Sequence, residues 1–478
     1  MGSGQVTDWQ GKHVTVAGLG VSGVPAAKVL HGLGARVTVV NDGDDPRTRE
    51  QAAELQALGV TVRLGDGATL PEGTELVVTA PGWRPDKPLF LAAERAGVPV
   101  WGDVELAWRL RGTVPGKPVA PWLCVTGTNG KTTTTQMLAS ILRAAGLRTA
   151  AVGNIGVSLL DAVLGDEPYD VLAVELSSYQ LHWAPSLRAH SAAVLNLAPD
   201  HLDWHGSMEA YARDKGRVYE GNQVACVYNV ADKATEDLVR EADVEEGCRA
   251  VGFTLGTPGP SQLGVVEGIL VDRAFVENRR ESAQELAEVS DVNPPAPHNI
   301  ANALAAAALA RAFGVPPQAV RDGLRAFTPD AHRIAHVADV HGVAYVDDSK
   351  ATNTHAAEAS LAAYGSIVWI AGGLAKGATF DELVARSAGR LRGVVLIGAD
   401  RALIREALAR HAPEVPVVDL DRTDTGAMLQ AVQEAARLAQ PGDTVLLAPA
   451  CASMDMFANY NKRGDAFAEA VRELGAGA

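Results

Sequence analysis

Short runs of β-branched and other apolar residues alternate with Ala- and Leu-rich stretches along the whole chain. This alternation is typical of α/β proteins with parallel sheets, because each crossover between parallel strands needs a helix. A chain of 478 residues has room for about three domains, at roughly 150 residues per domain. The sequence therefore predicts an α/β protein of three consecutive domains.

Two breaks divide the expected strands into three groups. Gly112–Pro121 is rich in Pro and Gly and is expected to be a linker, and Phe327–Pro329 marks the next boundary. The predicted domains are residues 1–113, 114–327 and 328–478. The polar region Thr254–Asp291 suggests a small antiparallel excursion, and Pro297–Phe313 an Ala-rich helix. The expected strands are Val14–Ala17, Val37–Val40, Leu76–Thr79, Val98–Trp101, Trp122–Thr126, Thr149–Val152, Val171–Leu176, Ala192–Asn196, Val224–Asn229, Val343–Val346, Ile367–Ala371, Val394–Ile397, Val417–Leu420 and Thr444–Leu447.

The charge balance argues against some kinds of partner. Lys and Arg number 42 and Asp and Glu number 57, so the formal net charge is −15. A protein that coats nucleic acid or an anionic membrane usually carries the opposite sign. We therefore expect no nucleic-acid and no membrane partner, although a local phosphate site is compatible with an acidic chain.

The cysteines and apolar stretches favour a reducing compartment. The cysteines are far apart and show no Cys-x-x-Cys spacing, which argues against a disulfide framework or a zinc ribbon. The N-terminal residues lack the apolar run of a signal peptide, and Ala301–Ala310 is too short to span a bilayer. We expect a soluble, cytoplasmic protein in which Cys451 is a packed residue rather than a nucleophile. The four cysteines are Cys124, Cys226, Cys248 and Cys451.

The first glycine-rich motif is G-x-G-x-x-G at Gly18–Gly23, after an expected strand and at the start of an expected helix. Glycines permit a tight turn, and a helix N-terminus offers N–H groups and its positive dipole end to a diphosphate. Asn41 and Asp42 end the next strand, near the place where an acidic residue would hold a ribose hydroxyl. Alone, the motif suggests a nicotinamide dinucleotide, and tight packing is the other explanation; the sequence leaves both open.

The second motif, GTNGKTT at Gly127–Thr133, also lies between a strand and an Ala- and Leu-rich helix. Its backbone N–H groups would cradle phosphates, Lys131 would reach the β- and γ-phosphate oxygens, and Thr132 would bind Mg²⁺. The spacing departs from the strict Walker pattern, because Val125 stands where that pattern has a glycine. A chance Gly-Lys-Thr rarely falls at such a junction, so we expect a nucleotide-binding P-loop.

Three further positions in the same stretch carry titratable groups. Glu175 ends an apolar strand, so its carboxylate should emerge at the sheet edge where α/β proteins bind ligands, as a candidate for Mg²⁺. The segment Asp200–His205 holds two His and two Asp, but zinc usually needs further ligands; His201 on a second Mg²⁺ or against substrate is favoured. Lys215 follows Tyr211 by four residues on a helix that Ser207 should cap, and a solvated lysine is its ordinary interpretation.

Together with motifs further along the chain, these segments resemble the ATP-dependent Mur ligases of peptidoglycan synthesis. The resemblance covers essentially the whole chain in one order. The segments that carry it are GTNGKTT, ELSS, PDHLDWHG, YARDK, HNIANALAA, AHRIAHV, DDSKATN, GGLAKGATF and APACASMDMFANYNKRG.

The resemblance implies a Rossmann-like N-terminal domain, a central P-loop ATPase domain with a mainly parallel sheet, and a Rossmann-like C-terminal domain. The GLGVSG start, NIG at Asn154–Gly156 and CASMDMF are similar to the branch of the family that adds D-glutamate. This branch implies UDP-N-acetylmuramoyl-L-alanine and D-glutamate as substrates, an acyl phosphate intermediate, ATP, two Mg²⁺ ions and a monomer. The N-terminal domain would then hold UDP rather than a nicotinamide dinucleotide.

The resemblance also assigns residues to each ligand. The ATP residues would be Gly127, Thr128, Asn129, Gly130, Lys131, Thr132, Thr133, Asn299, Asn302, Arg333 and Asp348. Those for the UDP substrate would be Val21, Ser22, Asn41, Asp42, Gly82, Asn154 and His201, and those for D-glutamate Lys350, Thr352, Lys376, Ser453, Met454 and Tyr460. The catalytic residues would be Lys131, Glu175, His201 and a carbamylated Lys215, and the metal ligands Thr132, Glu175, His201 and Lys215.

Three other functions would explain part of the sequence. A ligase similar to folylpolyglutamate synthase shares this P-loop variant but would lack the N-terminal glycine-rich domain. An NAD-dependent oxidoreductase with an attached NTPase domain would leave Lys215, DDSKATN and CASMDMF without a role. An ATP-gated binding protein without catalysis would need no acceptor pocket.

Overall fold

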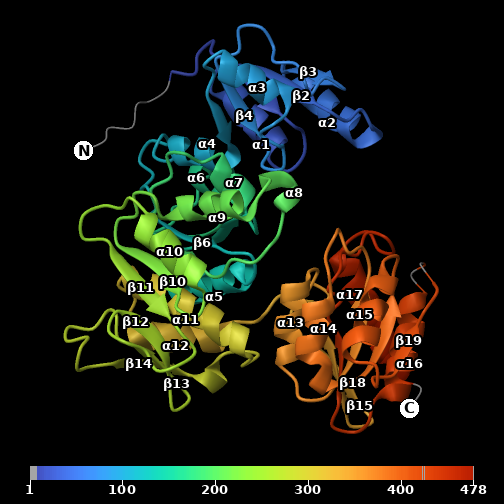
Figure 1. The fold of residues 1–478 in the computed structure, drawn as a ribbon. Coiled ribbons are helices and arrows are strands. Elements are labelled where there is room, and N and C mark those ends of the chain that lie inside the picture. The colour runs from blue at the N-terminus through green and yellow to red at the C-terminus, as the bar shows by residue number, and fades with distance from the viewer. Residues whose placement is uncertain (1–7, 423, 425, 477–478) are drawn as a thin grey trace. The chain divides into compact units, whose positions relative to one another are not determined.

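The computed structural model describes residues 8–422, 424 and 426–476, and within them the strands form three sheets (Figure 1). The described chain divides into two compact units. The first runs up to Val292 and takes in Ile300–Phe327, and the second takes in Asn293–Asn299 and runs from Thr328 onward. The first unit contains two of the sheets and the second contains the third.

The first sheet has five parallel strands in the order β3-β2-β1-β4-β5. The order changes direction at β1, and in open α/β sheets ligands bind at the carboxyl edge beside such a point. The strands are β1 (His13–Ala17), β2 (Arg36–Asn41), β3 (Thr61–Leu64), β4 (Leu76–Thr79) and β5 (Val100–Gly102). The helices are α1 (Gly23–Gly32), α2 (Pro46–Ala57), α3 (Pro88–Arg95) and α4 (Asp103–Leu110).

The central sheet has the order β14-β13-β12-β11-β10-β9-β6-β8-β7. Its strands are parallel from β7 to β12, and β13 and β14 add the antiparallel extension expected from the polar region. The strands are β6 (Trp122–Thr126), β7 (Ala151–Gly153), β8 (Leu172–Glu175), β9 (Ser191–Val194), β10 (Ala225–Asn229), β11 (Arg249–Phe253), β12 (Gln262–Val266), β13 (Ile269–Asp272) and β14 (Gln284–Glu288).

Helices far apart in the sequence pack on this central sheet. Helix α12 packs against α5, and the two helices approach closely at Gly323, where an added Cβ would lie 2.4 Å from Ile141 Cα. In α11, all residues from Ala303 to Ala310 are buried, as expected for an Ala-rich helix that is apolar on every side. The helices are α5 (Lys131–Ala144), α6 (Leu159–Leu164), α7 (Ser178–His182), α8 (Leu202–His205), α9 (Met208–Gly216), η1 (Arg217–Tyr219), α10 (Lys233–Glu241), η2 (Val289–Asp291), α11 (Pro297–Ala312) and α12 (Pro317–Ala326).

The sheet of the second unit has the order β15-β16-β20-β17-β18-β19, with β15 antiparallel to the parallel remainder. Its central strands β17 and β20 are buried along their whole length, with helices on both faces. The strands are β15 (Ala335–Val340), β16 (Val343–Asp347), β17 (Ile367–Gly372), β18 (Leu391–Ile397), β19 (Val417–Asp419) and β20 (Thr444–Leu447). The helices are α13 (Thr354–Ala362), α14 (Asp381–Ser387), η3 (Ala388–Arg390), α15 (Arg401–His411), α16 (Ala427–Leu438) and α17 (Tyr460–Ala476).

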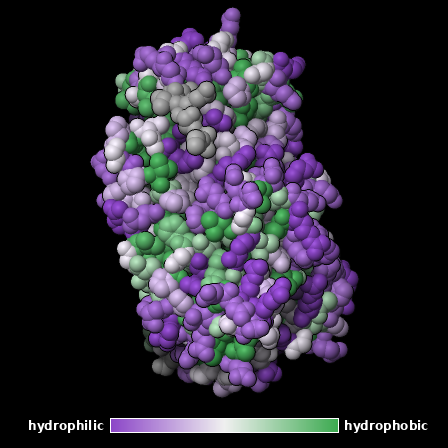
Figure 2. Space-filling model, turned by 90° about the vertical axis from the view of Figure 1, so that its left-hand side faces the viewer, coloured by the Kyte–Doolittle hydropathy of each residue, from purple (hydrophilic) through white to green (hydrophobic). Residues whose placement is uncertain are grey.

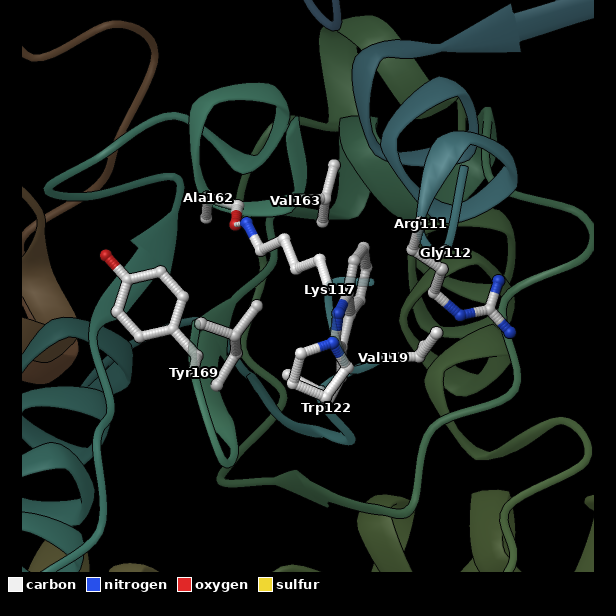
Figure 3. A pocket seen from close by; sticks show the side chains of 11 residues that line it. Arg111, Gly112, Lys117, Val119, Trp122, Ala162, Val163 and Tyr169 are labelled. Carbon is white, nitrogen blue, oxygen red and sulfur yellow. Dashed lines mark hydrogen bonds between the residues drawn. The ribbon is translucent and has the colours of Figure 1, made fainter. Parts of the chain in front are cut away.

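The expected linker Gly112–Pro121 contains no helix or strand, and its Lys117 side chain contacts helix α6 of the central domain (Figure 3). Lys117 Nζ donates to the Ala162 and Gly165 carbonyls, which caps the C-terminal end of α6. The cavity beneath the linker, between Trp122 and Tyr169, has a volume of about 20 Å³. Since a cavity of this size holds one water molecule or little more, we assign it no ligand.

In the part of the chain that the structure describes, none of the helices is long and apolar enough to cross a bilayer. On the face shown in Figure 2, hydrophilic and hydrophobic residues are interspersed. The two most exposed large hydrophobic side chains among the described residues are Val21, at 84%, and Met454, at 64%. Both were predicted to bind substrates, so ligand binding would account for their exposure.

Candidate active site

The GTNGKTT loop connects β6 to α5 and depends on two glycines with positive φ. Gly127 has φ +149° and Gly130 has φ +84°, and a Cβ at Gly130 would lie only 2.4 Å from Asn302 Oδ1 on α11. Asn196 follows β9, the strand that pairs with β6. It holds the loop in place, because its side-chain oxygen accepts a hydrogen bond from Asn129 N at 2.8 Å. The loop therefore has the sharp, side-chain-free turn that lets backbone approach a phosphate.

Lys131, the first residue of α5, folds its side chain back over this loop. Its Nζ donates to the carbonyls of Gly127 and Thr128 at 2.8 and 2.9 Å. Thr132 and Thr133 follow in the first turn, at the positive end of the helix dipole. The ammonium and the helix N-terminus thus lie together at the carboxyl end of β6, as the sequence predicted.

Glu175 is the last residue of β8, which pairs with β6 directly beside the P-loop. Its side chain is buried, with 1% of the residue exposed. One oxygen, Oε1, accepts from Asn154 Nδ2 at 2.9 Å, whereas Oε2 is buried and has no hydrogen-bond partner among the described residues. An unpartnered buried carboxylate oxygen is costly unless a ligand occupies it, so Oε2 is a strong candidate for a cation ligand.

Lys215 is a buried residue, so the interpretation as a solvated lysine is wrong. The residue is 1% exposed on α9, and its Nζ donates to the Gly127 carbonyl at 2.9 Å and lies 4.8 Å from the centre of the Tyr211 ring. Burial, and then the positive charge of Lys131, hold the pKa of Lys215 well below its usual value. This shift favours the neutral form of the amine. The predicted cap by Ser207 is present, because its hydroxyl accepts from Ala210 N.

Asp214, next to Lys215, fixes α9 against α7 and α8. Burial alone would raise the pKa of Asp214, but hydrogen bonds from His182 and His205 and the Arg217 charge lower it to about 2. His205 also bonds Ser178 Oγ through Nε2, at 2.9 Å. The sequence interpretation missed this network, whose members come from the four short helical elements α7, α8, α9 and η1.

His201 and His205 do not converge on one point, because both ring nitrogens of His205 are engaged by Asp214 and Ser178. His201 adopts a left-handed backbone conformation with φ +54°, and its ring centre lies 4.8 Å from that of Tyr179. Burial is the main cause that lowers the pKa of His201. Within the described residues, no group of three or more His, Cys, Asp or Glu side chains is placed to hold a metal by itself.

A cavity of about 260 Å³ separates the first glycine-rich loop from the NIG segment. Ser22 does not cap α1 with its side chain; instead its hydroxyl donates to Asp103 Oδ2 at 3.1 Å. Among the described lining residues, Asp103 is the one with an ionisable side chain. The lining residues are Val21, Ser22, Pro25, Asp103, Gly153, Asn154, Ile155, Gly156, Ser158, Leu159 and Leu160.

Of the residues predicted for the UDP substrate, Val21, Ser22 and Asn154 line this cavity, whereas the others lie outside its lining. Asn41 Oδ1 accepts from Leu19 N at 3.0 Å and so orders the glycine-rich loop. Asp42 is paired with Lys87, and the Gly82 carbonyl accepts from Trp204 Nε1. His201 is also absent from the lining.

Asp103 was not identified from the sequence. It is the first residue of α4, a position where an acidic side chain is ordinary at a helix N-terminus. Its contacts to Ser22 and to Gln180 Nε2, at 3.1 and 3.5 Å, join residues about 80 positions apart. Burial raises the pKa of Asp103 above its usual value. The one sequence signal nearby is the S-x-x-Q capping box of α7, which contains Gln180.

In the second unit, three predicted segments emerge at one sheet edge because they follow the neighbouring parallel strands β16, β20 and β17. Leu374 and Ala452 exchange backbone hydrogen bonds of 2.9 Å, which joins the loop of Lys376 to that of Ser453. Lys350 Nζ lies 4.1 Å from the centre of the Tyr460 ring. The predicted D-glutamate residues Lys350, Thr352, Lys376, Ser453, Met454 and Tyr460 therefore come from this edge and the start of α17.

Asp348 follows β16 and is buried. Burial raises its pKa to about 6, although hydrogen bonds from Ser360 Oγ and Ile334 N and the Arg333 charge act in the opposite direction. Asn299, predicted to face ATP, is buried near the start of α11 and donates to the Pro294 carbonyl. Cys451 is buried, as expected of a packed residue, and its pKa is raised to about 12 by burial.

Comparisons with known proteins identify the class. The family model of the Mur ligase middle domain matches residues 125–310, and that of the Mur ligase glutamate ligase domain matches residues 332–451. Residues 13–79 match the model of pyridine nucleotide-disulphide oxidoreductases, as expected for a dinucleotide-type glycine-rich loop. A solved MurF ligase from Thermotoga maritima in complex with ADP has the same fold, with TM-score 0.56 and 16% identity over 97% of this chain and 96% of that chain.

The chain belongs to the Mur ligase family. A UDP-N-acetylmuramoylalanine--D-glutamate ligase from Streptomyces avermitilis is 88% identical over 98% of this chain and 100% of its own length. The ligase of the same name from Thermobifida fusca is 61% identical over 97% of this chain and 99% of its own length.

Proposed function

We propose that the chain is an ATP-dependent ligase that joins D-glutamate to UDP-N-acetylmuramoyl-L-alanine and releases ADP and phosphate. The observation that carries this proposal is the 88% identity, over 98% of the chain, to a ligase named for these two reactants. The P-loop and the unpartnered Glu175 oxygen support it, because they supply a site for ATP and a cation.

The reaction requires two chemical steps, because an amine does not displace an oxide from a carboxylate at neutral pH. The γ-phosphoryl group of ATP is first transferred to the alanyl carboxylate, which gives an acyl phosphate and ADP. The amine of D-glutamate then attacks the acyl carbon, and phosphate leaves from the tetrahedral intermediate. Since two anions must meet in the first step, the protein contributes mainly positioning and charge neutralisation.

The donor set beside the P-loop fits Mg²⁺, which prefers oxygen ligands and keeps several waters. The orphaned Glu175 Oε2 and the Thr132 hydroxyl would hold one ion, and His201 with a carbamylated Lys215 would hold a second. The ions would neutralise the phosphate charge. Carbamylation joins the neutral Lys215 amine to CO₂ with loss of a proton, and the depressed pKa of Lys215 favours it. This modification replaces a buried neutral amine with an anion.

The residues of the P-loop would bind the phosphates of ATP. Lys131 is tethered to the loop carbonyls of Gly127 and Thr128, and it would exchange these partners for the β- and γ-phosphate oxygens. Asn129, Gly130 and Thr133 would supply backbone and side-chain donors in the same turn. Asn299, Asn302, Arg333 and Asp348 are proposed to hold the nucleoside and the phosphates.

The two other substrates are assigned to separate sheet edges. The cavity lined by Val21, Ser22 and Asn154 would take the nucleotide-sugar substrate, with Asn41, Asp42, Gly82 and His201 along its remaining length. Lys376 and Lys350 would pair with the carboxylates of D-glutamate. Thr352, Ser453, Met454 and Tyr460 would complete the acceptor site.

We further propose domains at residues 1–113, 114–327 and 328–478, one for each reactant, in a monomeric cytoplasmic enzyme. ATP and a nucleotide sugar are cytoplasmic metabolites, which supports the proposed location. Size-exclusion chromatography with light scattering tests the monomer, and a dimer at working concentration would contradict it.

The test of the function is phosphate release from ATP in the presence of UDP-N-acetylmuramoyl-L-alanine and each of a panel of amino acids. We expect D-glutamate to stimulate release strongly, with formation of the amide product seen by mass spectrometry. Release that no amino acid stimulates would contradict the acceptor assignment. Binding of NAD at the first glycine-rich loop, in place of a UDP compound, would instead favour the oxidoreductase alternative.

A further inference from the structure

Two cysteine sulfurs face each other in the central sheet. Cys226 lies in β10 and Cys248 lies in the turn before β11, and their Sγ atoms are 3.9 Å apart. The register explains the approach, because Cys226 pairs with Ala250, two residues beyond Cys248. A disulfide bond is about 2.05 Å long, so the sulfurs must approach by about 2 Å to form one.

The two thiols differ in burial and in the direction of their pKa shifts. Cys226 is buried in a strand that pairs on both sides, with β9 and β11. Cys248 is half-buried in a turn closed by a hydrogen bond from its own N–H to the Glu245 carbonyl. The Cys226 thiol and the Arg249 backbone N–H lower the pKa of Cys248, whereas the same contact to Cys248, and then burial, raise that of Cys226. Cys248 is therefore the less buried of the two thiols, and the lowered pKa favours the thiolate there.

We propose that Cys226 and Cys248 are a reversible redox pair that a hydroperoxide converts into a disulfide. The Cys248 thiolate attacks one peroxide oxygen, the O–O bond breaks, and hydroxide leaves to give a sulfenic acid. The Cys226 sulfur then attacks the Cys248 sulfur, the S–O bond breaks, and the hydroxide that leaves takes the Cys226 proton as water. For hydrogen peroxide, one peroxide and two thiols give one disulfide and two waters. A dithiol reductant reverses the reaction.

The bond would close the chain segment that carries α10 (Lys233–Glu241). Leu238 on this helix packs against α9 at Gly216, where an added Cβ would lie 2.9 Å from Leu238 Cδ2. Gly216 is the neighbour of Lys215. Closing such a segment lowers the conformational entropy of the unfolded chain, so the oxidised protein should resist unfolding better than the reduced protein.

The test treats the full-length protein with hydrogen peroxide and then blocks free thiols before proteolysis and mass spectrometry. We expect a peptide pair linked through Cys226 and Cys248, loss of two of the four thiols, and full reversal by dithiothreitol. The thermal unfolding midpoint should rise by at least about 2 °C on oxidation and return on reduction. Neither readout depends on the ligase activity, so the proposed function and this proposal can fail separately.

Three variants identify the partners. Cys226→Ser should give no cross-link and should leave a sulfenic acid at Cys248 that dimedone traps, and Cys248→Ser should give no cross-link and an unoxidised Cys226. The control Cys451→Ala should still form the 226–248 bond. Oxidation of Cys248 to sulfinic acid in the unmodified protein without any cross-link would overturn the proposal, and so would a cross-link that survives Cys226→Ser.

Discussion

The Asn154 amide donates to Glu175 Oε1 at 2.9 Å, and this bond leaves the second carboxylate oxygen buried and without a partner among the described residues. The relationship links the NIG segment to the strand beside the P-loop. It also separates two tasks within one carboxylate, because one oxygen sets the orientation and the other remains available to a cation.

The first prediction concerns this carboxylate. Glu175→Gln replaces a charged ligand oxygen with a neutral amide, so phosphate release should fall by at least about a hundredfold through loss of metal-dependent charge neutralisation. Raising the Mg²⁺ concentration should recover part of the rate. The exposed Glu167→Gln is the matched control and should behave like the unmodified enzyme. A variant at Glu175 with normal Mg²⁺ dependence would contradict the assignment.

The second prediction concerns Lys215. Lys215→Ala should lose most of the activity, and acetate or another short carboxylate should restore part of it by filling the space of a carbamate. The unmodified enzyme should lose activity in CO₂-free buffer and regain it with bicarbonate, because the neutral amine needs CO₂. Lys215→Arg should not be rescued, since the guanidinium fills the site with a permanent cation. An unchanged kcat in Lys215→Ala would refute the role.

The third prediction concerns Asp103. The Ser22 hydroxyl donates its hydrogen bond to Asp103, so this pair can accept hydrogen bonds from a ligand better than it can donate them. Sugar hydroxyls and the N-acetyl N–H suit it, and a phosphate does not. Asp103→Asn should therefore weaken binding of UDP-N-acetylmuramoyl-L-alanine by about tenfold and binding of UDP by less than about twofold, measured by calorimetry. Equal loss for both ligands would mean that Asp103 only orders the loop.

The fourth prediction uses the sign of the Asp348 shift. Its pKa in the folded protein is about 6, above the usual 3.8, so between these pH values the folded state binds more protons than the unfolded state. Stability should therefore fall as the pH rises from about 4 to about 6, by at most about 3 kcal/mol from this group, and stay lowered above that range. Asp348→Asn should raise the unfolding midpoint more at pH 7.5 than at pH 4.5. A gain that is independent of pH would contradict the shift.

The fifth prediction concerns Tyr460, the first residue of α17. Its ring contacts the Lys350 ammonium at 4.1 Å, so Tyr460→Phe keeps the cation–π contact and should leave the KM for D-glutamate within about twofold. Tyr460→Ala removes the ring and should raise that KM about five- to tenfold, because Lys350 loses its support. A Phe variant as impaired as the Ala variant would show that the hydroxyl is the important group.

Strands formed by a short apolar run were predictable, including the edge strands β5, β7 and β19, whereas strands that mix polar and apolar residues were not. The expected strands Leu76–Thr79 and Thr444–Leu447 coincide with β4 and β20, because both lie inside their sheets and consist of apolar runs. β3 and β15 were missed. Both are edge strands that face solvent, so their sequences mix exposed polar residues such as Arg63 and Asp339 with apolar ones.

In the candidate site, the features that depend on local contacts were predictable, and those that depend on contacts between distant residues were not. The P-loop and the cap at Ser207 are local, and the sequence predicts both. The burial of Lys215 depends on Gly127, 88 residues earlier, and the Ser22–Asp103 bond spans 81 residues. No periodicity or spacing within one segment reports such contacts, so only the fold reveals them.

The hydrogen-bonded side chains of Ser178, His205 and Asp214 have a further consequence. A serine hydroxyl, a histidine and a carboxylate linked at 2.9 and 3.0 Å are the constellation that hydrolases use to activate a nucleophile. Here the serine and the histidine side chain are sealed from solvent. An enzyme that handles an acyl phosphate must keep activated water away from it, or ATP is spent without product. Because these three groups are buried, they can hold the helices together without having a water molecule within reach to deprotonate.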